Sequence, residues 1–249
     1  MYLFITVKIE ELYYWYYKQF IHKGFCSQQG GAKFCNYIRE QFQQNLDWVT
    51  SRIVSEEGRS SSYWKMVSLF HTQLDGLRVG WLARARDDNR QIPDDFDATW
   101  FAYFINFYPD VGDFIHKYHK DFKEASQSSS IVFTAPSCSA MVKVAGEEVL
   151  VGHATWHVYE SLGFKMLKRY SLAFHLAGAG AGGELVPGRT IAMSSYAGNI
   201  FSLDDLYSTS AGLASLETTL FVYNSSLLEE NTAVGQVWEP VRGGLHRIV

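Results

Sequence analysis

The sequence is short of cysteine and of charge, and it has no long apolar run. Three cysteines are too few for a disulfide scaffold, and the odd number leaves at least one cysteine outside any intrachain disulfide. A formal net charge of −4 offers no basic footprint for nucleic acid. No segment reaches the roughly 18–20 apolar residues that span a bilayer. We therefore predict no nucleic-acid partner and no transmembrane segment.

A signal peptide is not visible either. Such a leader has a basic start, an apolar run of roughly 7–15 residues and a small-residue cleavage site. Here the apolar stretch 2–7 is too short, has no basic start and is followed at once by Lys8. Either the protein is cytosolic or its true N-terminus is missing. Because residues 241–249 stop in an apolar pattern, we expect a partial chain.

The sequence does have a large share of apolar and aromatic side chains. Apolar residues make up 47% and aromatic residues 16% of the 249 positions, so the chain can bury a sizeable core. This composition excludes intrinsic disorder and a coiled coil. The length suits one large domain or two small ones.

The first half of the chain has helical periodicity. Apolar residues recur at steps of three and four, as expected of helices that face a core, in the segments 9–20, 38–53, 63–81 and 100–107. Gly76 and Gly80 weaken the end of the third pattern. The fourth stops before Pro109, because the residue that precedes a proline avoids helical geometry.

The second half is rich in β-strand patterns. A polar tract begins at position 125 and predicts an exposed linker over about 125–137. A hairpin is predicted over 141–153 around Gly146, followed by strands at 168–174, 190–196 and 213–223. Helices followed by strands favour an α+β fold over alternating βαβ units. We therefore expect a helical segment 1–137 and a β-rich segment 138–249 that together form one domain.

Two patterns that resemble ligand sites are weak. Gly178–Gly183 spells the G-x-G-x-x-G dinucleotide fingerprint, but Pro187 prevents the helix that should follow. Asp204 and Asp205 are adjacent, and neighbouring carboxylates in a strand point to opposite faces, which favours a polar turn over an acid pair. We expect neither a cofactor nor a metal.

Cys26 and Cys35 flank a pair of glycines. A local disulfide, two buried thiols and a metal site are all conceivable, although no C-x-x-C or nearby histidine pair supports a metal. Export of the protein would favour the disulfide.

Cys138 lies between Ser137 and Ser139, just beyond the polar tract. A lone cysteine is usually a small buried thiol, and it needs a base partner to act as a nucleophile. The predicted hairpin returns His153 near the level of Cys138 on the neighbouring strand. The two residues are a candidate catalytic pair, and the alternative for His153 is an ordinary sheet histidine.

Several ordered motifs resemble the phospholipase B-like family, whose members are lysosomal or secreted proteins with the N-terminal-nucleophile hydrolase fold. They extend the similarity over most of the chain from about position 36, and they are the segments 63–64, 73–77, 138–143, 151–156, 168–170, 187–188, 194–205 and 216–219. The resemblance implies a four-layer αββα sandwich, which would be incomplete at the C-terminus of this chain.

The resemblance also implies self-cleavage of the Ser137–Cys138 bond, which would make Cys138 an N-terminal nucleophile. His153, Thr155 and Trp156 match a motif that lines the pocket, and they are expected to orient the substrate by hydrogen bonding. Ser195 is expected in the wall of the active site.

The implied function is hydrolysis of phospholipid acyl esters, with the cleaved N-terminal fragment as a partner. An amidase with the same fold, or an impaired or truncated relative without activity, is the alternative. A lysosomal or extracellular location is implied, and Asn224 begins a glycosylation acceptor pattern. Two departures from the family are Ala154, where an asparagine is usual, and Ala197, where a proline is usual.

Overall fold

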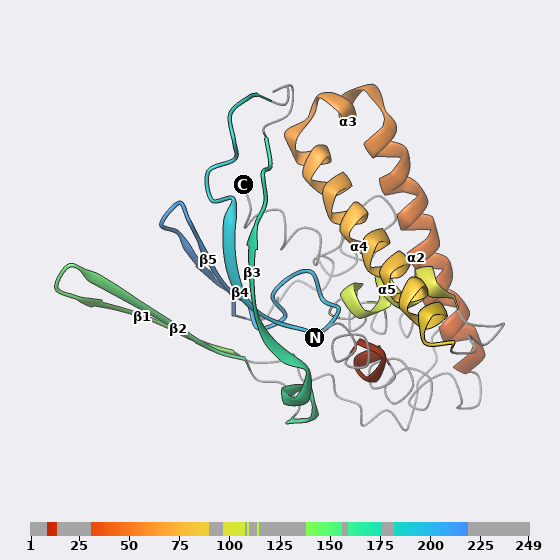
Figure 1. Ribbon diagram of the computed structural model, residues 1–249. Helices are drawn as coiled ribbons and strands as arrows, with labels where there is room; N and C mark the ends of the chain where they lie inside the picture. Colours follow the sequence, from red (N-terminus) through yellow and green to blue (C-terminus); the bar gives the residue numbers. More distant parts are fainter. Residues whose placement is uncertain are drawn as a thin grey trace, which may run out of the picture.

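A computed structural model shows how these patterns fold. The residues that it describes are 9–13, 31–89, 97–107, 109, 114, 138–155, 159–175 and 182–218. The described helices are α2 (Gly31–Val54), α3 (Glu56–Ser60), α4 (Ser62–Asp87) and α5 (Ala98–Phe107). Figure 1 shows α2 and α4 side by side, joined at one end by the short α3. A sheet lies next to this helical layer.

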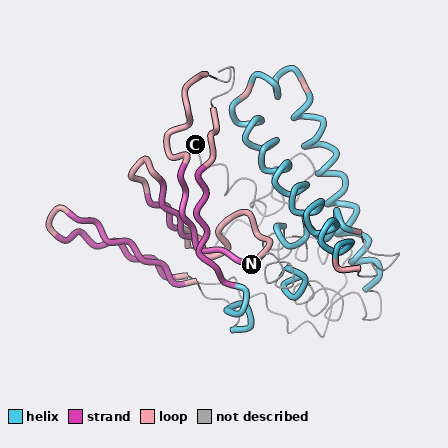
Figure 2. The backbone as a smooth tube through the Cα atoms, viewed as in Figure 1, coloured by secondary structure: helices cyan, strands magenta, loops and turns pink. Residues whose placement is uncertain are grey.

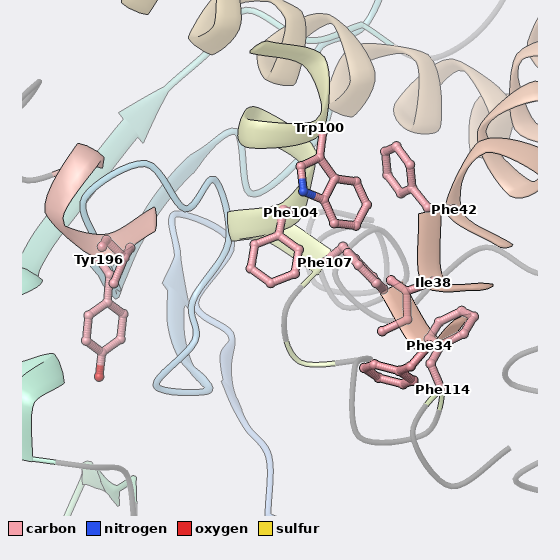
Figure 3. Close-up of a cluster of buried hydrophobic side chains, with 9 residues drawn as sticks. Phe34, Ile38, Phe42, Trp100, Phe104, Phe107, Phe114 and Tyr196 are labelled. Atoms are coloured by element: carbon pink, nitrogen blue, oxygen red, sulfur yellow. The ribbon is translucent and has the colours of Figure 1, made fainter. Parts of the chain in front are cut away.

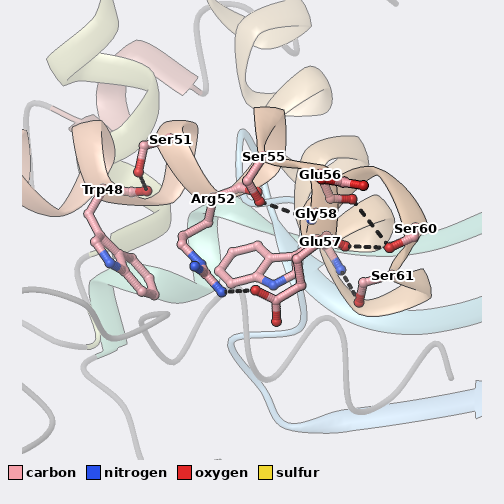
Figure 4. Close-up of polar contacts among 10 residues, drawn as sticks. Trp48, Ser51, Arg52, Ser55, Glu56, Glu57, Gly58, Ser60 and Ser61 are labelled. Atoms are coloured by element: carbon pink, nitrogen blue, oxygen red, sulfur yellow. Dashed lines mark hydrogen bonds and ion pairs between the residues drawn. The ribbon is translucent and has the colours of Figure 1, made fainter.

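Serine caps make the sharp corner between α2 and α4. The Ser55 hydroxyl accepts a hydrogen bond from the amide of Gly58 at 3.0 Å, and Ser61 caps α4 in the same way. Arg52 and Glu57 form an ion pair across the corner (Figure 4). A Cβ at Gly58 would lie 2.0 Å from the carbonyl oxygen of Arg52, so the close approach of the two segments requires glycine.

The second, third and fourth helical predictions are confirmed in their main features, whereas the first, over 9–20, is described as helix only at 9–13 and otherwise lies outside the described residues. The second and third patterns bury Ile38, Phe42, Val49, Val67, Phe70 and Leu74. Tyr63, which begins the third pattern, is 37% exposed instead. The two glycines do not end α4, which continues to Asp87, because both lie on the exposed face, where a missing side chain removes no packing.

Aromatic rings form the centre of the helical layer. Asp97 begins α5 by accepting hydrogen bonds from the amides of Thr99 and Trp100, both at 2.9 Å. The rings of Phe42 and Trp100 meet edge to face with 5.2 Å between their centroids. Figure 3 shows the cluster, whose buried members are Leu12, Phe34, Ile38, Phe42, Trp100, Phe104, Phe107, Phe114 and Tyr196.

Two asparagines fasten α5 to the turn that follows residue 196. The side-chain amide of Asn106 donates to the carbonyl of Gly198 at 3.0 Å, and its oxygen accepts from the amide of Ile200 at 2.8 Å. Asn199 donates in return to the carbonyl of Ile105. These bonds connect the helical layer to the loop that carries Asp204.

The described strands form two antiparallel sheets. The first is a hairpin of β1 (Ser139–Ala145) and β2 (Glu148–Ala154). The second has the order β3-β4-β5-β6, with bounds Lys165–Ser171, Thr190–Tyr196, Leu206–Thr209 and Ala214–Leu216. Figure 2 shows that the hairpin projects away from the four-stranded sheet and the helices.

The strand predictions vary in accuracy. The hairpin is confirmed, with Gly146 in its turn at a φ of 65°, and β4 has the predicted bounds 190–196. The prediction 168–174 was three residues too late, because β3 follows the 3-10 helix Tyr159–Phe164 directly and pairs with β4 from Lys165 onward. The last predicted strand is described only as Ala214–Leu216.

Helices followed by antiparallel strands confirm the α+β class. The four-layer sandwich stays a prediction, and so does the division at position 138, since the linker 125–137 lies outside the described residues. Within the described ranges, no helix is long and apolar enough to cross a membrane.

Candidate functional site

The base of the hairpin brings three of the predicted site residues to one face. Ala140 pairs with His153, and Ser139 pairs with Ala154. Extending this register by one position places Cys138 opposite Thr155. Because side chains alternate along a strand, Cys138, His153 and Thr155 share a face of the ladder. The register agrees with the expectation that His153 lies near the level of Cys138, and the catalytic pairing of the two residues stays a prediction.

The imidazole of His153 has a hydrogen-bond partner at each ring nitrogen. Its Nε2 lies 2.6 Å from the carbonyl oxygen of Glu217, at the end of β6. Its Nδ1 lies 3.3 Å from the hydroxyl of Thr155. That hydroxyl donates in turn to the carbonyl oxygen of Asp204 at 2.9 Å. The four-stranded sheet thus holds the histidine of the hairpin.

Asp204 is the centre of a buried polar cluster and is only 3% exposed. Its carboxylate accepts hydrogen bonds from Tyr196 at 2.6 Å and from Ser194, and it pairs with the Lys165 ammonium at 2.9 Å. Burial alone would raise the pKa of Asp204, but the bonds from Ser194, Tyr196 and Lys165 outweigh it and hold that pKa below its usual value. The carboxylate is therefore charged at neutral pH.

Burial also raises the pKa of Tyr196, and the neighbouring Asp204 raises it further. The phenol therefore keeps its proton and remains a donor to the carboxylate. Sequence reasoning did not find this cluster. The adjacent acids predicted a polar turn, and a turn is present, with Asp205 in the left-handed region at a φ of 54°. The available signal was the alternation of Ser194 and Tyr196, which places two hydroxyls on one face of β4.

Lys168 holds the same loop from β3. Its ammonium donates to the carbonyl of Tyr196 at 2.6 Å and to that of Asn199. Burial lowers the pKa of Lys168 to about 7. The sequence motif 168–170 includes this lysine but predicts no role for it. Its described hydrogen bonds are with backbone carbonyls of the loop before Asp204.

Ser195 lies apart from these contacts. Its side chain is fully buried and donates to the carbonyl of Phe201 at 2.6 Å. By strand alternation it faces away from Ser194 and Tyr196. Its expected place in the wall of an active site stays a prediction. Ser137, Trp156 and Asn224 lie outside the described residues.

Position 154 also faces away from the candidate site. Ala154 pairs with Ser139 and is exposed, and alternation puts its side chain on the face opposite His153 and Thr155. A larger amide at this position would not extend toward His153 from the described backbone. The replacement of the usual asparagine therefore leaves the face that carries Cys138 and His153 unchanged.

The cysteines differ in state. Cys35 is disulfide-bonded, and Cys26, the predicted neighbour, lies outside the described residues. Cys138 is partly exposed and keeps its thiol. Among the described residues, no group of three or more histidine, cysteine, aspartate or glutamate side chains could hold a metal ion. The chemistry that the site offers is that of a thiol on the same face of the hairpin as an imidazole and a threonine hydroxyl.

The chain is similar in sequence to known proteins. The Phospholipase B family profile matches residues 6–245. "Putative phospholipase B-like 1" of Caenorhabditis elegans is 33% identical over 211 residues, which cover 83% of this chain and 33% of the relative. "Putative phospholipase B-like 2" of Homo sapiens is 30% identical over 216 residues, with coverages of 84% and 34%. "Phospholipase B" of Crotalus adamanteus is 29% identical over 214 residues, with coverages of 82% and 36%. The chain spans about a third of the length of these relatives.

Proposed function

The chain belongs to the phospholipase B family, and from this premise we propose that it carries the nucleophile of a self-processing hydrolase that cleaves phospholipid acyl esters. The observation that supports the proposal best is the shared face of Cys138, His153 and Thr155 at the base of the hairpin. A thiol needs a nearby proton-transfer group and an oriented partner in order to act on a carbonyl carbon. The proton-transfer group is the α-amino group that processing would create on Cys138, and the oriented partner is His153 on the same face of the hairpin.

Self-processing is the first step of the proposed mechanism. The Cys138 sulfur attacks the carbonyl carbon of Ser137, the peptide C–N bond breaks, and the nitrogen takes up a proton to become the α-amino group of Cys138. Water then hydrolyses the Ser137 thioester and restores the thiol. The new α-amino group has an ordinary pKa of about 7.7–8.0, so at neutral pH a useful fraction of it accepts protons.

Hydrolysis of the lipid repeats this chemistry on an ester. The α-amino group takes the thiol proton, the sulfur attacks the acyl carbonyl, and the alcohol part of the phospholipid leaves with that proton. Water then attacks the thioester, releases a fatty acid and restores Cys138. An amide substrate would follow the same path with an amine as the leaving group, and the described contacts favour neither class over the other.

The wider setting of the site belongs to the same proposal. The apolar residues Val142, Val144, Val149 and Val151 share one face of the hairpin and are 38–72% exposed. Such a face suits a sandwich of the N-terminal-nucleophile type in which a further layer covers the hairpin. The cleaved N-terminal fragment would remain attached through the contacts of α5. The disulfide at Cys35 suits an oxidising compartment, consistent with a lysosomal or extracellular protein.

The experiment compares hydrolysis of a phosphatidylcholine with hydrolysis of its matched acyl-amide analogue. Wild-type protein should release fatty acid, and Cys138→Ala should neither process itself nor hydrolyse either substrate. His153→Gln should lose activity, whereas the matched control His175→Gln, at a histidine that contacts the carbonyl of Gly183, should keep it. Hydrolysis by Cys138→Ala at the wild-type rate would overturn the proposal. Faster cleavage of the amide would reassign the substrate class.

A further inference from the structure

The hydrogen bonds around His153 fix where the protons lie. The carbonyl oxygens of Glu217 and Asp204 can only accept hydrogen bonds. Nε2 of His153 must therefore carry a proton in order to bond Glu217, and the single hydroxyl proton of Thr155 is committed to Asp204. The Thr155 oxygen then has only lone pairs to offer to Nδ1, 3.3 Å away. That contact is a hydrogen bond only if Nδ1 also carries a proton.

We propose that Asp204 and Thr155 are positioning residues that hold His153 as the doubly protonated imidazolium. The inference rests on the proposed function and sharpens it, because it gives His153 a role distinct from that of a base. An imidazolium cannot accept the thiol proton, so this duty falls to the α-amino group of Cys138. His153 instead stabilises negative charge, either on the sulfur before attack or on the carbonyl oxygen during attack.

The contacts of the Asp204 side chain fix the position of the Asp204 backbone carbonyl, which accepts from Thr155. Ser194 and Tyr196 on β4 and Lys165 on β3 hold the carboxylate from two strands. Asp205, in the left-handed conformation, then turns the chain into β5, and its carbonyl accepts from the amide of Glu217 at 3.3 Å. The carbonyl of Glu217, which bonds His153, and the carbonyl of Asp204, which bonds Thr155, therefore both lie at one end of the β5–β6 ladder. Loss of the carboxylate contacts would release both.

The charged groups near this end of the ladder are compatible with a cationic histidine. Asp204 is anionic and paired with Lys165, whose ammonium lies on the carboxylate at 2.9 Å. Asp205 and Glu217 add carboxylates on the adjoining turn and strand end, and Cys138 adds a thiol on the hairpin. Among the described residues, the ammonium groups of this region are those of Lys165, which is paired with Asp204, and Lys168, which donates to the carbonyls of Tyr196 and Asn199. An opposite charge nearby, such as the Asp204 carboxylate, favours the protonated form of an imidazole.

The test measures protonation directly. Nitrogen NMR of the full chain, with histidine labelled on the ring, should show both nitrogens of His153 protonated at pH 7 and a titration midpoint above that pH. Thr155→Val removes the acceptor at Nδ1 and should lower the midpoint by about one pH unit or more, since hydrogen bonds to charged groups are strong. Thr155→Ser keeps the hydroxyl and should restore the wild-type midpoint. Asp204→Asn should lower the midpoint, while Asp47→Asn, an exposed change on α2, should not.

Alkylation of Cys138 by iodoacetamide across the same pH range gives a second readout. Loss of the imidazolium should move the onset of alkylation to higher pH in Thr155→Val and leave it in place in Thr155→Ser. Unfolding midpoints measured in parallel identify a variant that fails to fold. A singly protonated His153 at pH 7 in the wild type, or equal midpoints in Thr155→Val and Thr155→Ser, would overturn the inference. Neither readout requires hydrolysis, so an inactive protein with a cationic His153 would refute only the proposed function.

Discussion

Gly198→Ala tests the close approach between α5 and the loop that carries Asp204. Gly198 has a φ of 82°, in the region that disfavours residues with a Cβ. An added Cβ would lie 2.6 Å from Cδ1 of Ile105 and 3.2 Å from two γ carbons of Ile9. The left-handed backbone costs about 1–2 kcal/mol for alanine. Overpacking adds about 1–3 kcal/mol, so we expect a total loss of about 2–5 kcal/mol.

A second substitution separates the cost of the backbone strain from the cost of the overpacking. Ile105→Val deletes the Cδ1 atom in the worst contact and should itself cost about 1 kcal/mol. In that background Gly198→Ala should cost about 1 kcal/mol less, because the backbone strain and the Ile9 contacts remain while the worst overlap is gone. The four free energies of unfolding come from urea titrations followed by tryptophan fluorescence.

The matched control is Gly76→Ala on α4. No atom lies within 4 Å of the Cβ that this change would add, and the helix is exposed there. Alanine should therefore stabilise the protein by about 0.5–1 kcal/mol. A Gly198→Ala variant as stable as wild type, or one whose cost is the same with and without Ile105→Val, would contradict the predicted clash with Ile105.

Three further predictions concern stability. Burial lowers the pKa of His71 from 6.5 to about 4, so between these pH values the unfolded chain binds a proton at His71 that the folded chain does not bind. Between pH 6.5 and 4, urea titrations should therefore show that the free energy of unfolding falls by about 3 kcal/mol more in wild type than in His71→Gln. Burial lowers the pKa of Lys168 from 10.5 to about 7, so wild type should gain stability relative to Lys168→Met as pH rises from 7 to 10, by at most about 1.4 kcal/mol per pH unit. An equal change in the free energy of unfolding with pH in the two proteins would contradict this. Reduction of the Cys35 disulfide should cost about 2–5 kcal/mol, measured as the shift in free energy of unfolding with and without a reductant.

Local patterns in the sequence predicted much of the fold. The recurrence of apolar residues located α2, α4 and α5, because burial against one core requires that spacing. Alternation around Gly146 located the hairpin and the level of His153. The start of β3 was predicted three residues late, since it depends on pairing with β4 at Lys165 rather than on any local signal.

The polar cluster could not be predicted because it depends on long-range contacts. Asp204 is adjacent to Asp205 in sequence, and only the folding of β3 against β4 brings Lys165, Ser194 and Tyr196 to its carboxylate. The hydrogen bond between His153 and the carbonyl of Glu217 joins residues 64 positions apart in the sequence, one in the hairpin and one at the end of the four-stranded sheet. A pattern read along the chain contains neither contact, so Asp204 was predicted as an ordinary turn residue.

The proposed function depends on cleavage of the bond before Cys138, which would make this residue an N-terminal nucleophile. The most direct test is N-terminal sequencing together with intact-mass analysis of the protein purified from its source and of its Cys138→Ala variant. We expect a new chain that begins at Cys138 in the natural protein and an uncleaved chain in the variant. An uncut Ser137–Cys138 bond in active protein, or the same cleavage in the variant, would contradict it.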